Sequence, residues 1–338
     1  MPLGSRLSGV SSRMDRPGAP LRVGVVGVGY LGRHHARILS SLPDVQLVAV
    51  VDTNGGRAQD VAAATSSRAF YDASTVVGLV DAVTVAVPTA DHLAVALPFL
   101  NAGVPVLVEK PMAGTLVEAD AMIAAAHRSG AVLAVGHTER FNPAVEAARQ
   151  VLADPRFIEG HRLGTFPERS LDIDVVLDLM IHDLDVVLSL VKADVESIEA
   201  VGVPVLTGRI DIANARLRFS NGCIANLTAS RISRDRVRKL RFFQPGAYVS
   251  IDYAAQKLEV WRPIQQPGGV PTIEGGEMPV ASDEPLKREL EDFVAAIRTS
   301  RGPLVSGTDG RRVLDLATRI SDRIAAQRSP QPDRPVSR

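Results

Sequence analysis

The sequence predicts an α/β protein with two domains: a Rossmann-type, doubly wound parallel sheet at the N-terminus and a second α/β domain with a mostly antiparallel sheet. Two observations support this prediction. Short apolar runs alternate with helical stretches over residues 21–137, which is typical of a parallel sheet covered on both faces. After residue 195 the β-like runs follow one another directly, and Asn221-Gly222 between two of them is a strong hairpin signal.

In the first half, runs of β-branched apolar residues predict strands, and the amphipathic stretches between them predict helices. The predicted strands are residues 23–26, 45–51, 67–71, 82–87, 105–108 and 131–135, and the helices are residues 33–42, 57–64, 72–79, 92–102 and 115–129. In the second half, helices are predicted at residues 143–152, 175–191, 286–299 and 309–327, and strands at residues 197–204, 211–219, 223–230, 238–244, 248–252 and 257–262. Residues 263–279 are rich in Pro and Gly, which predicts a loop.

The composition limits the classes of function. The chain has 338 residues, of which 46% are hydrophobic, and its 38 Lys and Arg residues balance 38 Asp and Glu residues. This balance gives no global signal for binding to nucleic acid or to an anionic membrane surface. The single cysteine, Cys223, excludes an internal disulfide and fits a reducing cytoplasm. No uninterrupted apolar run reaches the ~18 residues of a membrane span, and no signal peptide is predicted.

A glycine motif after the first predicted strand indicates a dinucleotide site. The motif Gly27-Val28-Gly29-Tyr30-Leu31-Gly32 leads into a predicted helix, and Asp52 ends the second strand twenty residues after Gly32. In such a motif the first glycine allows the tight turn, the second lets the backbone approach a pyrophosphate, and the third lets the helix pack close to the strand. Asp52 can accept hydrogen bonds from a ribose diol and would repel a 2′-phosphate. This favours NAD over NADP, although Arg57 can still reach a phosphate.

Polar residues at the ends of two further strands are expected to extend the cofactor site, because doubly wound sheets bind ligands at the carboxyl ends of their strands. Pro88 and Thr89 follow one strand, and Glu109 and Lys110 follow another, immediately before Pro111. We expect the cofactor to contact Tyr30, Leu31, Pro88, Thr89, His92, Glu109 and Lys110, in addition to Gly27, Gly29, Gly32 and Asp52.

Lys110 and a polar stripe on one apolar helix are the candidates for catalysis. An ammonium group at Lys110 can stabilise the alkoxide that forms as hydride leaves a substrate, or it belongs to an ordinary surface lysine. Asp178, His182 and Asp185 stand at positions i, i+4 and i+7 of a predicted helix that is otherwise nearly all apolar. His182 can take the hydroxyl proton, and Asp178 can orient its imidazole. The alternatives are a satisfied His–Asp pair in the core and a metal site, but no second His or Cys cluster supports a metal.

Arg140 and Asn142 follow the last predicted strand of the first domain, where the chain should cross to the second. Both are predicted to bind substrate together with Lys110 and His182. Arg140 can hold an anionic or hydroxyl-rich substrate, or it can equally fix the domain interface.

The one basic cluster of the sequence spans residues 231–241. Alternation in a strand would place Arg234, Arg236 and Arg238 on a single face. That face is either a solvated or subunit-facing surface, or a site for an anionic substrate such as a nucleotide diphosphate. Nucleic acid does not fit, because no aromatic residues interleave with the basic ones.

Together these motifs resemble the Gfo/Idh/MocA oxidoreductases, the family of glucose–fructose oxidoreductase and inositol dehydrogenase. The resemblance covers about residues 21–327 and is carried by the glycine motif, by Glu109-Lys110-Pro111, and by Asp178 followed by His182. It implies a Rossmann domain joined to an α/β domain whose sheet is open and mostly antiparallel. That sheet is commonly the subunit interface, which implies a homodimer or homotetramer. The resemblance also matches Lys110, Asp178 and His182 to the catalytic positions.

The predicted organisation follows from this resemblance and from the composition of the chain ends. Residues 1–20 are expected to be a disordered extension, residues 21–137 an NAD-binding Rossmann domain, residues 138–327 a domain for substrate binding and oligomerisation, and residues 328–338 a disordered tail.

Within the family, residues 136–143, 175–185 and 211–216 are most similar to the UDP-N-acetylglucosamine 3-dehydrogenase type. This similarity implies a cytoplasmic, NAD-dependent enzyme that oxidises the sugar C3 hydroxyl for amino-sugar synthesis in the lipid A route. Its expected partner is then a small sugar or nucleotide sugar, and it is expected to bind neither nucleic acid nor a membrane. The alternatives are a dehydrogenase of a free sugar, an inositol or a linear tetrapyrrole, and a non-catalytic NAD-binding sensor. The intact Lys110, Asp178 and His182 argue against the sensor.

Overall fold

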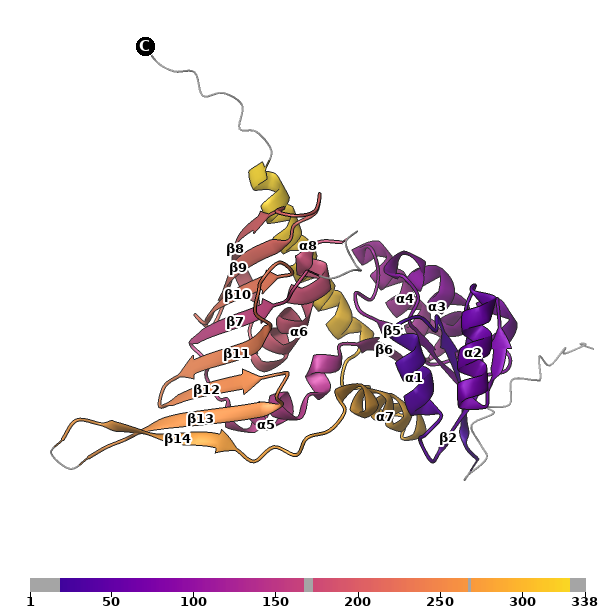
Figure 1. Ribbon diagram of the computed structural model, residues 1–338, viewed down its shortest axis with the longest axis horizontal. Helices are drawn as coiled ribbons and strands as arrows, with labels where there is room; N and C mark the ends of the chain where they lie inside the picture. Colours follow the sequence, from indigo (N-terminus) through magenta and orange to yellow (C-terminus); the bar gives the residue numbers. More distant parts are fainter. Residues whose placement is uncertain (1–18, 167–172, 267–268, 329–338) are drawn as a thin grey trace, which may run out of the picture. The chain divides into compact units, whose positions relative to one another are not determined.

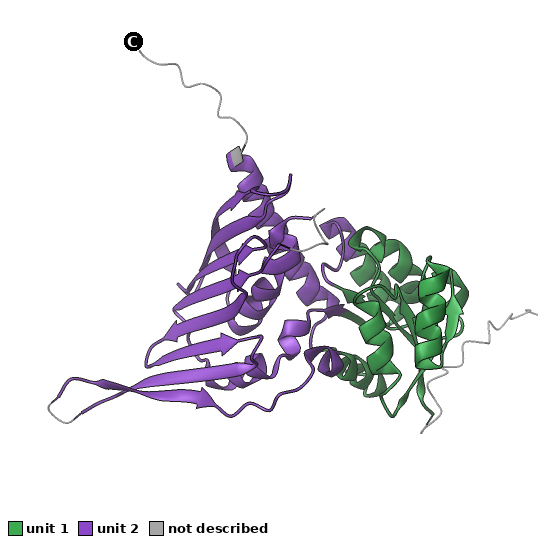
Figure 2. Cartoon of the chain, in the orientation of Figure 1, with its two compact units in different colours: residues 1–109, 121–134, 290–303 green, residues 110–120, 135–289, 304–338 purple. Residues whose placement is uncertain are grey.

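The computed structural model describes residues 19–166, 173–266 and 269–328. The chain divides into two compact units (Figure 2). Unit 1 contains residues 1–109, 121–134 and 290–303, and unit 2 contains residues 110–120, 135–289 and 304–338. The two chain ends that were predicted to be disordered lie, apart from residues 19, 20 and 328, outside the described residues.

The first sheet has six strands in the order β3-β2-β1-β4-β5-β6. Its strands are β1 (Leu21–Val26), β2 (Val45–Val51), β3 (Arg68–Phe70), β4 (Ala82–Val85), β5 (Val106–Glu109) and β6 (Leu133–Gly136). The pairs β1–β2, β2–β3, β1–β4 and β4–β5 are all parallel. Strands β4, β5 and β6 are buried at every position, which explains why they are continuous apolar runs and not alternating ones. The predicted Rossmann-type parallel sheet is therefore confirmed.

The helices that connect these strands are α1 (Gly32–Leu39), α2 (Gly55–Thr65), α3 (His92–Asn101) and α4 (Leu116–Ser129). A further helix predicted over residues 72–79 is wrong, because only a single 3₁₀ turn, Ala73–Val76, forms there. The side chain of Asp72 accepts a hydrogen bond from the Ser74 amide, which closes a short local turn. The β-branched residues that follow, and then Gly78, have low helix propensity and do not extend it.

The second sheet has eight strands in the order β14-β13-β12-β11-β7-β10-β9-β8 (Figure 1). Its strands are β7 (Phe157–Leu163), β8 (Val195–Val203), β9 (Ile212–Phe219), β10 (Ile224–Ser230), β11 (Val237–Gln244), β12 (Ala247–Asp252), β13 (Lys257–Ile264) and β14 (Thr272–Met278). All neighbouring pairs are antiparallel except β7 with β10, which are parallel. The mostly antiparallel sheet predicted from the consecutive strands is thus confirmed.

Two strands of this sheet were not predicted. Strand β7 alternates buried and half-buried residues, but Gly160, His161 and Arg162 dilute its apolar signal. Gly160 lets two leucines pack over the strand, because a Cβ at this position would lie 2.6 Å from Leu227 Cδ2 and 3.0 Å from Leu240 Cδ1. Strand β14 lies inside the predicted loop. It is almost fully exposed and contains Gly275-Gly276, so only its pairing with β13 defines it as a strand.

Helices α5 (Pro143–Val151), α6 (Ile181–Leu190) and α8 (Gly307–Arg328) lie on one side of the second sheet and share its hydrophobic core (Figure 1). Helix α7 (Pro285–Arg298) precedes α8 in the chain. The helix predicted over residues 175–191 does not begin as a regular α-helix, because Val176–Met180 form a π-helical turn before α6. Across the described ranges, none of the helices combines the length and the apolar character that crossing a bilayer demands.

Candidate active site

The glycine motif forms a tight turn between β1 and α1. Gly27 has a positive φ of 83°, and a Cβ there would lie 2.7 Å from the backbone of Ala86. At Gly32 a Cβ would lie only 1.7 Å from the carbonyl oxygen of Gly27, so the first turn of α1 packs directly on the loop. Any other residue at either position would push the helix away from the sheet.

The space above Gly29 is suited to a dinucleotide. A Cβ built on Gly29 meets no atom closer than Arg57 Nη1, at 3.7 Å, so its backbone is open to a ligand. Tyr30 and Leu31, which follow it at the start of α1, are exposed although they are large and apolar. An open backbone at the N-terminus of a helix is the arrangement that holds a pyrophosphate. The residues of this loop therefore fit the phosphate portion of a dinucleotide cofactor.

Asp52 follows β2 and is buried beside the glycine loop. One carboxylate oxygen, Oδ2, accepts hydrogen bonds from the Val28 amide at 3.0 Å and from Arg57 Nη1 at 3.3 Å. The other, Oδ1, accepts from the Asn54 amide at 2.8 Å. The carboxylate is thus fixed in place, and the half-exposed guanidinium of Arg57 covers it. A ribose hydroxyl that bonded Asp52 would compete only with the weakest of these contacts.

The loop after β4 contains the predicted cofactor residues Pro88, Thr89 and His92. Thr89 to Asp91 form a short 3₁₀ turn after Pro88. The His92 ring is buried, and its Nε2 lies 2.9 Å from the carbonyl oxygen of Val87. His92 therefore helps to fix the shape of this loop, and the contacts of Pro88, Thr89 and His92 with the cofactor stay predictions.

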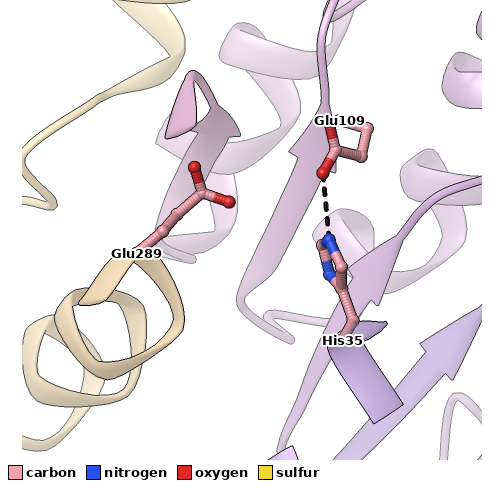
Figure 3. A group of neighbouring side chains, drawn as sticks. All are labelled: His35, Glu109 and Glu289. Atoms are coloured by element: carbon pink, nitrogen blue, oxygen red, sulfur yellow. Dashed lines mark hydrogen bonds and ion pairs between the residues drawn. The ribbon is translucent and has the colours of Figure 1, made fainter. Parts of the chain in front are cut away.

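Glu109 ends β5 and pairs with a residue that the sequence did not single out, His35 of α1. The Nε2 atom of His35 lies 2.9 Å from Oε1 of Glu109, and both side chains are buried (Figure 3). The pair joins α1 to β5 within unit 1. The signal for it was present in the sequence: a histidine three residues after Gly32 falls on the inward face of the helix. Glu109 is thus held at the end of its strand by His35, and its contact with the cofactor stays a prediction.

Lys110 and Asp178 come together in unit 2. The Nζ atom of Lys110 donates to the carbonyl oxygen of Asp178 at 2.8 Å and lies 3.5 Å from its Oδ1. Both side chains are mostly buried. The carbonyl is part of the π-helical turn before α6, where the regular hydrogen-bond ladder is altered. The ammonium of Lys110 is therefore held at the start of the helix that carries His182.

His182 lies one turn further along, in α6. Its Nδ1 is buried and makes no hydrogen bond to any described residue, and none joins it to Asp178. The prediction that Asp178 orients the imidazole is therefore not supported by the contacts, because that carboxylate faces Lys110. Burial lowers the pKa of His182 well below its usual 6.5, and the positive charges of Lys110 and Arg162 lower it further. The ring is consequently neutral at physiological pH and can accept a proton.

A buried ion-pair network beside His182 was not predicted. Arg162 of β7 donates to both oxygens of Asp183, at 2.9 and 3.0 Å, and its Nη1 donates to Glu139 at 3.0 Å. Its guanidinium also lies 4.9 Å from the centroid of the Tyr253 ring. Burial alone would lower the pKa of Arg162, but the two carboxylates raise it above its usual value. The network fixes α6 to the sheet and thereby places His182.

Arg140 and Asn142, predicted as substrate ligands, are buried and have internal partners. The Arg140 guanidinium forms two hydrogen bonds to Asp185 of α6, one of them 2.9 Å long. Asn142 caps α5 by accepting from the Ala144 amide, and its Nδ2 donates to the Tyr253 carbonyl at 3.0 Å. Removing one member of a buried ion pair typically costs about 3–5 kcal/mol, so these contacts are structurally important. Both residues support the site and leave little surface for a substrate.

The predicted basic face is wrong for two of its three arginines. Strand β11 begins at Val237, so Arg234 and Arg236 lie in the preceding turn. Arg236 donates to the Thr165 hydroxyl at 3.2 Å. Arg238 is the only one of the three within the strand, and it is exposed.

The comparisons with known proteins agree with this architecture. Residues 21–137 match the model of the Gfo/Idh/MocA oxidoreductase family, NAD-binding Rossmann fold, and residues 147–244 match the C-terminal domain model of the same family. A UDP-N-acetylglucosamine 3-dehydrogenase from Acidithiobacillus ferrooxidans is 41% identical over 89% of this chain and 96% of its own. Its crystal form in space group P21 superposes with a TM-score of 0.85, at 40% identity, over 90% of this chain and 98% of that one.

Two more distant relatives show how widely the fold is used. An inositol 2-dehydrogenase from Rhizobium meliloti is 26% identical over 91% of this chain and 98% of its own. A levoglucosan dehydrogenase in complex with NADH and levoglucosan has a TM-score of 0.83 at 19% identity over 91% of this chain and 98% of that chain, and this likeness concerns the fold alone. From both family models and the 41% identity, the chain belongs to the Gfo/Idh/MocA family of NAD-binding oxidoreductases.

Proposed function

We propose that this protein oxidises the C3 hydroxyl of UDP-N-acetylglucosamine to a ketone, with NAD as the cofactor. The observation that carries the proposal is the pairing of Lys110 with Asp178 one helical turn before a neutral His182. This grouping occurs in a chain that is 41% identical, over nearly its full length, to a UDP-N-acetylglucosamine 3-dehydrogenase. The 3-keto sugar would then supply an amino-transfer step, as in the lipid A route.

His182 and Lys110 have complementary roles in the proposed reaction. His182 takes the proton of the C3 hydroxyl, and its lowered pKa keeps it in the basic form that this step needs. Lys110 donates a hydrogen bond to the same oxygen and stabilises the negative charge that develops on it. Bound NAD would accept the C3 hydrogen with its electron pair, which leaves the ketone. Asp178 is a positioning residue that holds the ammonium of Lys110.

We propose that the part of the site that acts on the substrate also depends on the ion-pair network around Arg162. Arg162 is bonded to both Asp183 and Glu139, so its positive charge is already compensated and is not available to a ligand. Their role is to hold α6, so that His182 keeps one orientation. The ion pair between Arg140 and Asp185 of α6 holds the helix in the same way.

Asp52 is expected to set the preference for NAD over NADP. In Asp52→Ser the carboxylate that bonds the ribose diol is lost, and Arg57 is released to bind a 2′-phosphate. A hydrogen bond to a charged group contributes about 1.5–3 kcal/mol, so the ratio of kcat/KM for NAD to that for NADP should fall by about 10- to 100-fold. Steady-state kinetics with each cofactor measures this ratio. Adding Arg57→Ala should remove the gained use of NADP, and an unchanged ratio in Asp52→Ser would contradict the assignment.

Self-association through the second sheet is part of the proposal. The face of this sheet opposite α5, α6 and α8 carries an aromatic row in register across β7, β11, β12 and β13, formed by Phe157, Phe243, Tyr248 and Trp261. Phe157 and Phe243 have ring centroids 5.5 Å apart, and Phe243 and Tyr248 5.1 Å. Three of these rings line a depression of about 690 Å³. Such an apolar surface supports a homodimer or homotetramer. We also propose a cytoplasmic location, on the basis of the single buried cysteine.

The first test is the absorbance of reduced nicotinamide with purified protein, NAD or NADP, and a panel headed by UDP-N-acetylglucosamine. We expect reduction with the UDP-sugar and none with N-acetylglucosamine, glucose or myo-inositol. Reduction with a free polyol and not with the UDP-sugar would discard the proposed substrate and keep the oxidoreductase. Silence with every substrate, in protein that binds NAD, would contradict the proposed activity.

A further inference from the structure

Two arginines stand side by side on neighbouring strands of the second sheet. Arg162 of β7 and Arg238 of β11 are direct partners in the antiparallel register. Strand alternation places Arg238 on the same face as Leu240 and Phe242, which are buried in the core under the helices. Arg162 likewise shares its face with Ile158. Both guanidinium groups therefore belong to the face of the sheet from which α6 presents His182.

The two arginines differ in how their charge is compensated. Arg162 is buried and bonded to Asp183 and Glu139, two carboxylates for one guanidinium. Arg238 is exposed, and among the described residues its side chain has no ion pair or hydrogen bond. Its backbone carbonyl oxygen accepts from the Tyr253 amide at 3.0 Å. Arg238 thus carries an uncompensated positive charge at the edge of the buried network.

The register places this charge near the candidate catalytic residue, because Arg238 pairs with Arg162 and Arg162 is bonded to Asp183, the residue that follows His182 in α6. In line with this placement, the positive charges that lower the pKa of His182, after burial, include Lys110, Arg162 and Arg238. Because Lys110 is bonded to Asp178 and Arg162 to its carboxylates, Arg238 is the cation of this group that a ligand can reach without breaking an ion pair. An exposed guanidinium beside the reacting group suits an anion on the substrate, since its planar donors match phosphate oxygens in pairs.

We propose that Arg238 binds the pyrophosphate of a sugar-nucleotide substrate and so aligns the sugar ring with His182 and Lys110. This inference rests on the proposed function and adds a specificity-determining residue to it. A free sugar or an inositol lacks the anion, so Arg238 would give such substrates no advantage. Three other arginines of the basic cluster already have partners, because Arg231 is buried against Asp211, Arg236 bonds Thr165 and Arg241 bonds Glu159.

The test compares Arg238→Ala, Arg238→Lys and the control Arg319→Ala, which removes an exposed arginine of α8 in the same unit. UDP alone is titrated calorimetrically into each full-length protein in the presence of NAD, and KM and kcat for UDP-N-acetylglucosamine are measured. Loss of a charged hydrogen-bonding pair should weaken UDP binding and raise KM by about 10- to 100-fold in Arg238→Ala, with a much smaller change in kcat. Arg238→Lys should recover part of the loss, and Arg319→Ala should behave as the wild type.

The outcomes separate this inference from the proposed function. If the wild type oxidises UDP-N-acetylglucosamine but Arg238→Ala keeps its KM and its affinity for UDP, the role of Arg238 is wrong and the function stands. A fall in kcat at unchanged KM would also overturn the role, because Arg238 would then act on the reaction and not on the anion. If the wild type neither binds UDP nor oxidises the UDP-sugar, both proposals fail. Thermal unfolding midpoints equal to the wild type show that each variant is folded.

Discussion

Replacing Lys110 by Met is expected to lower kcat by about 10²- to 10⁴-fold while leaving the affinity for NAD nearly unchanged. Methionine keeps an unbranched apolar side chain like the stem of lysine, but it cannot donate a hydrogen bond to the substrate oxygen or stabilise its negative charge. The partner of Lys110 is the carbonyl oxygen of Asp178, at 2.8 Å, and not the glycine loop that fits the pyrophosphate. Turnover by the reduced-nicotinamide absorbance and NAD affinity by calorimetry together measure the two effects.

Lys192→Met is the matched control for this variant, because Lys192 is an exposed lysine in the same unit. It should retain the turnover and NAD affinity of the wild type. Substantial turnover in Lys110→Met, or an equal loss of NAD affinity, would show that Lys110 does not act on the substrate oxygen. Lys110→Arg is a useful third variant. Arginine keeps the charge but places it in a planar fork, so we expect only partial activity.

Replacing His182 by Asn is expected to lower kcat by a similar factor of about 10² to 10⁴, because the general base is removed. The wild-type pH profile carries a second expectation. Burial, and then the charges of Lys110 and Arg162, lower the pKa of His182, and the neutral ring is the active form. Lowering the pH protonates the ring and stops the reaction, but only below its shifted pKa. In a plot of log kcat/KM against pH, the midpoint of the acid limb should therefore lie below pH 6.5.

The pH profile of Lys110→Met gives an internal check on this assignment. Without the positive charge of Lys110, the pKa of His182 should rise, and the acid limb of the residual activity should move to higher pH. An acid limb at or above 6.5 in the wild type would contradict the lowered pKa. An acid limb that remains in His182→Asn would assign the titration to another group.

The features that could be predicted from the sequence are those that depend on residues close to one another in the chain. The turn at Gly27, the open backbone at Gly29 and the acid at Asp52 all lie within one strand–helix–strand unit, where spacing alone decides the geometry. The six strands of the first sheet were predictable for the same reason. Strand β14 was not, because it is exposed and glycine-rich and depends on its partner strand for its structure.

The partners within the candidate site could not be predicted, because they join distant parts of the chain. Asp178 and His182 are four residues apart, and a regular helix would place them on one stripe. The π-helical turn of Val176–Met180 alters that spacing, and the carboxylate of Asp178 lies near Lys110, 68 residues away in sequence. In the same way Arg162 was overlooked, because neither its strand nor its partners Asp183 and Glu139 form a local motif.

The aromatic row of the second sheet has a practical consequence. Trp261 is the only tryptophan of the chain, so the intrinsic indole emission of the protein comes from this one sheet face. The emission maximum should shift to shorter wavelength, and depend on protein concentration, if a second copy covers the row. The wild-type protein thus carries its own reporter of subunit assembly, and no label needs to be introduced.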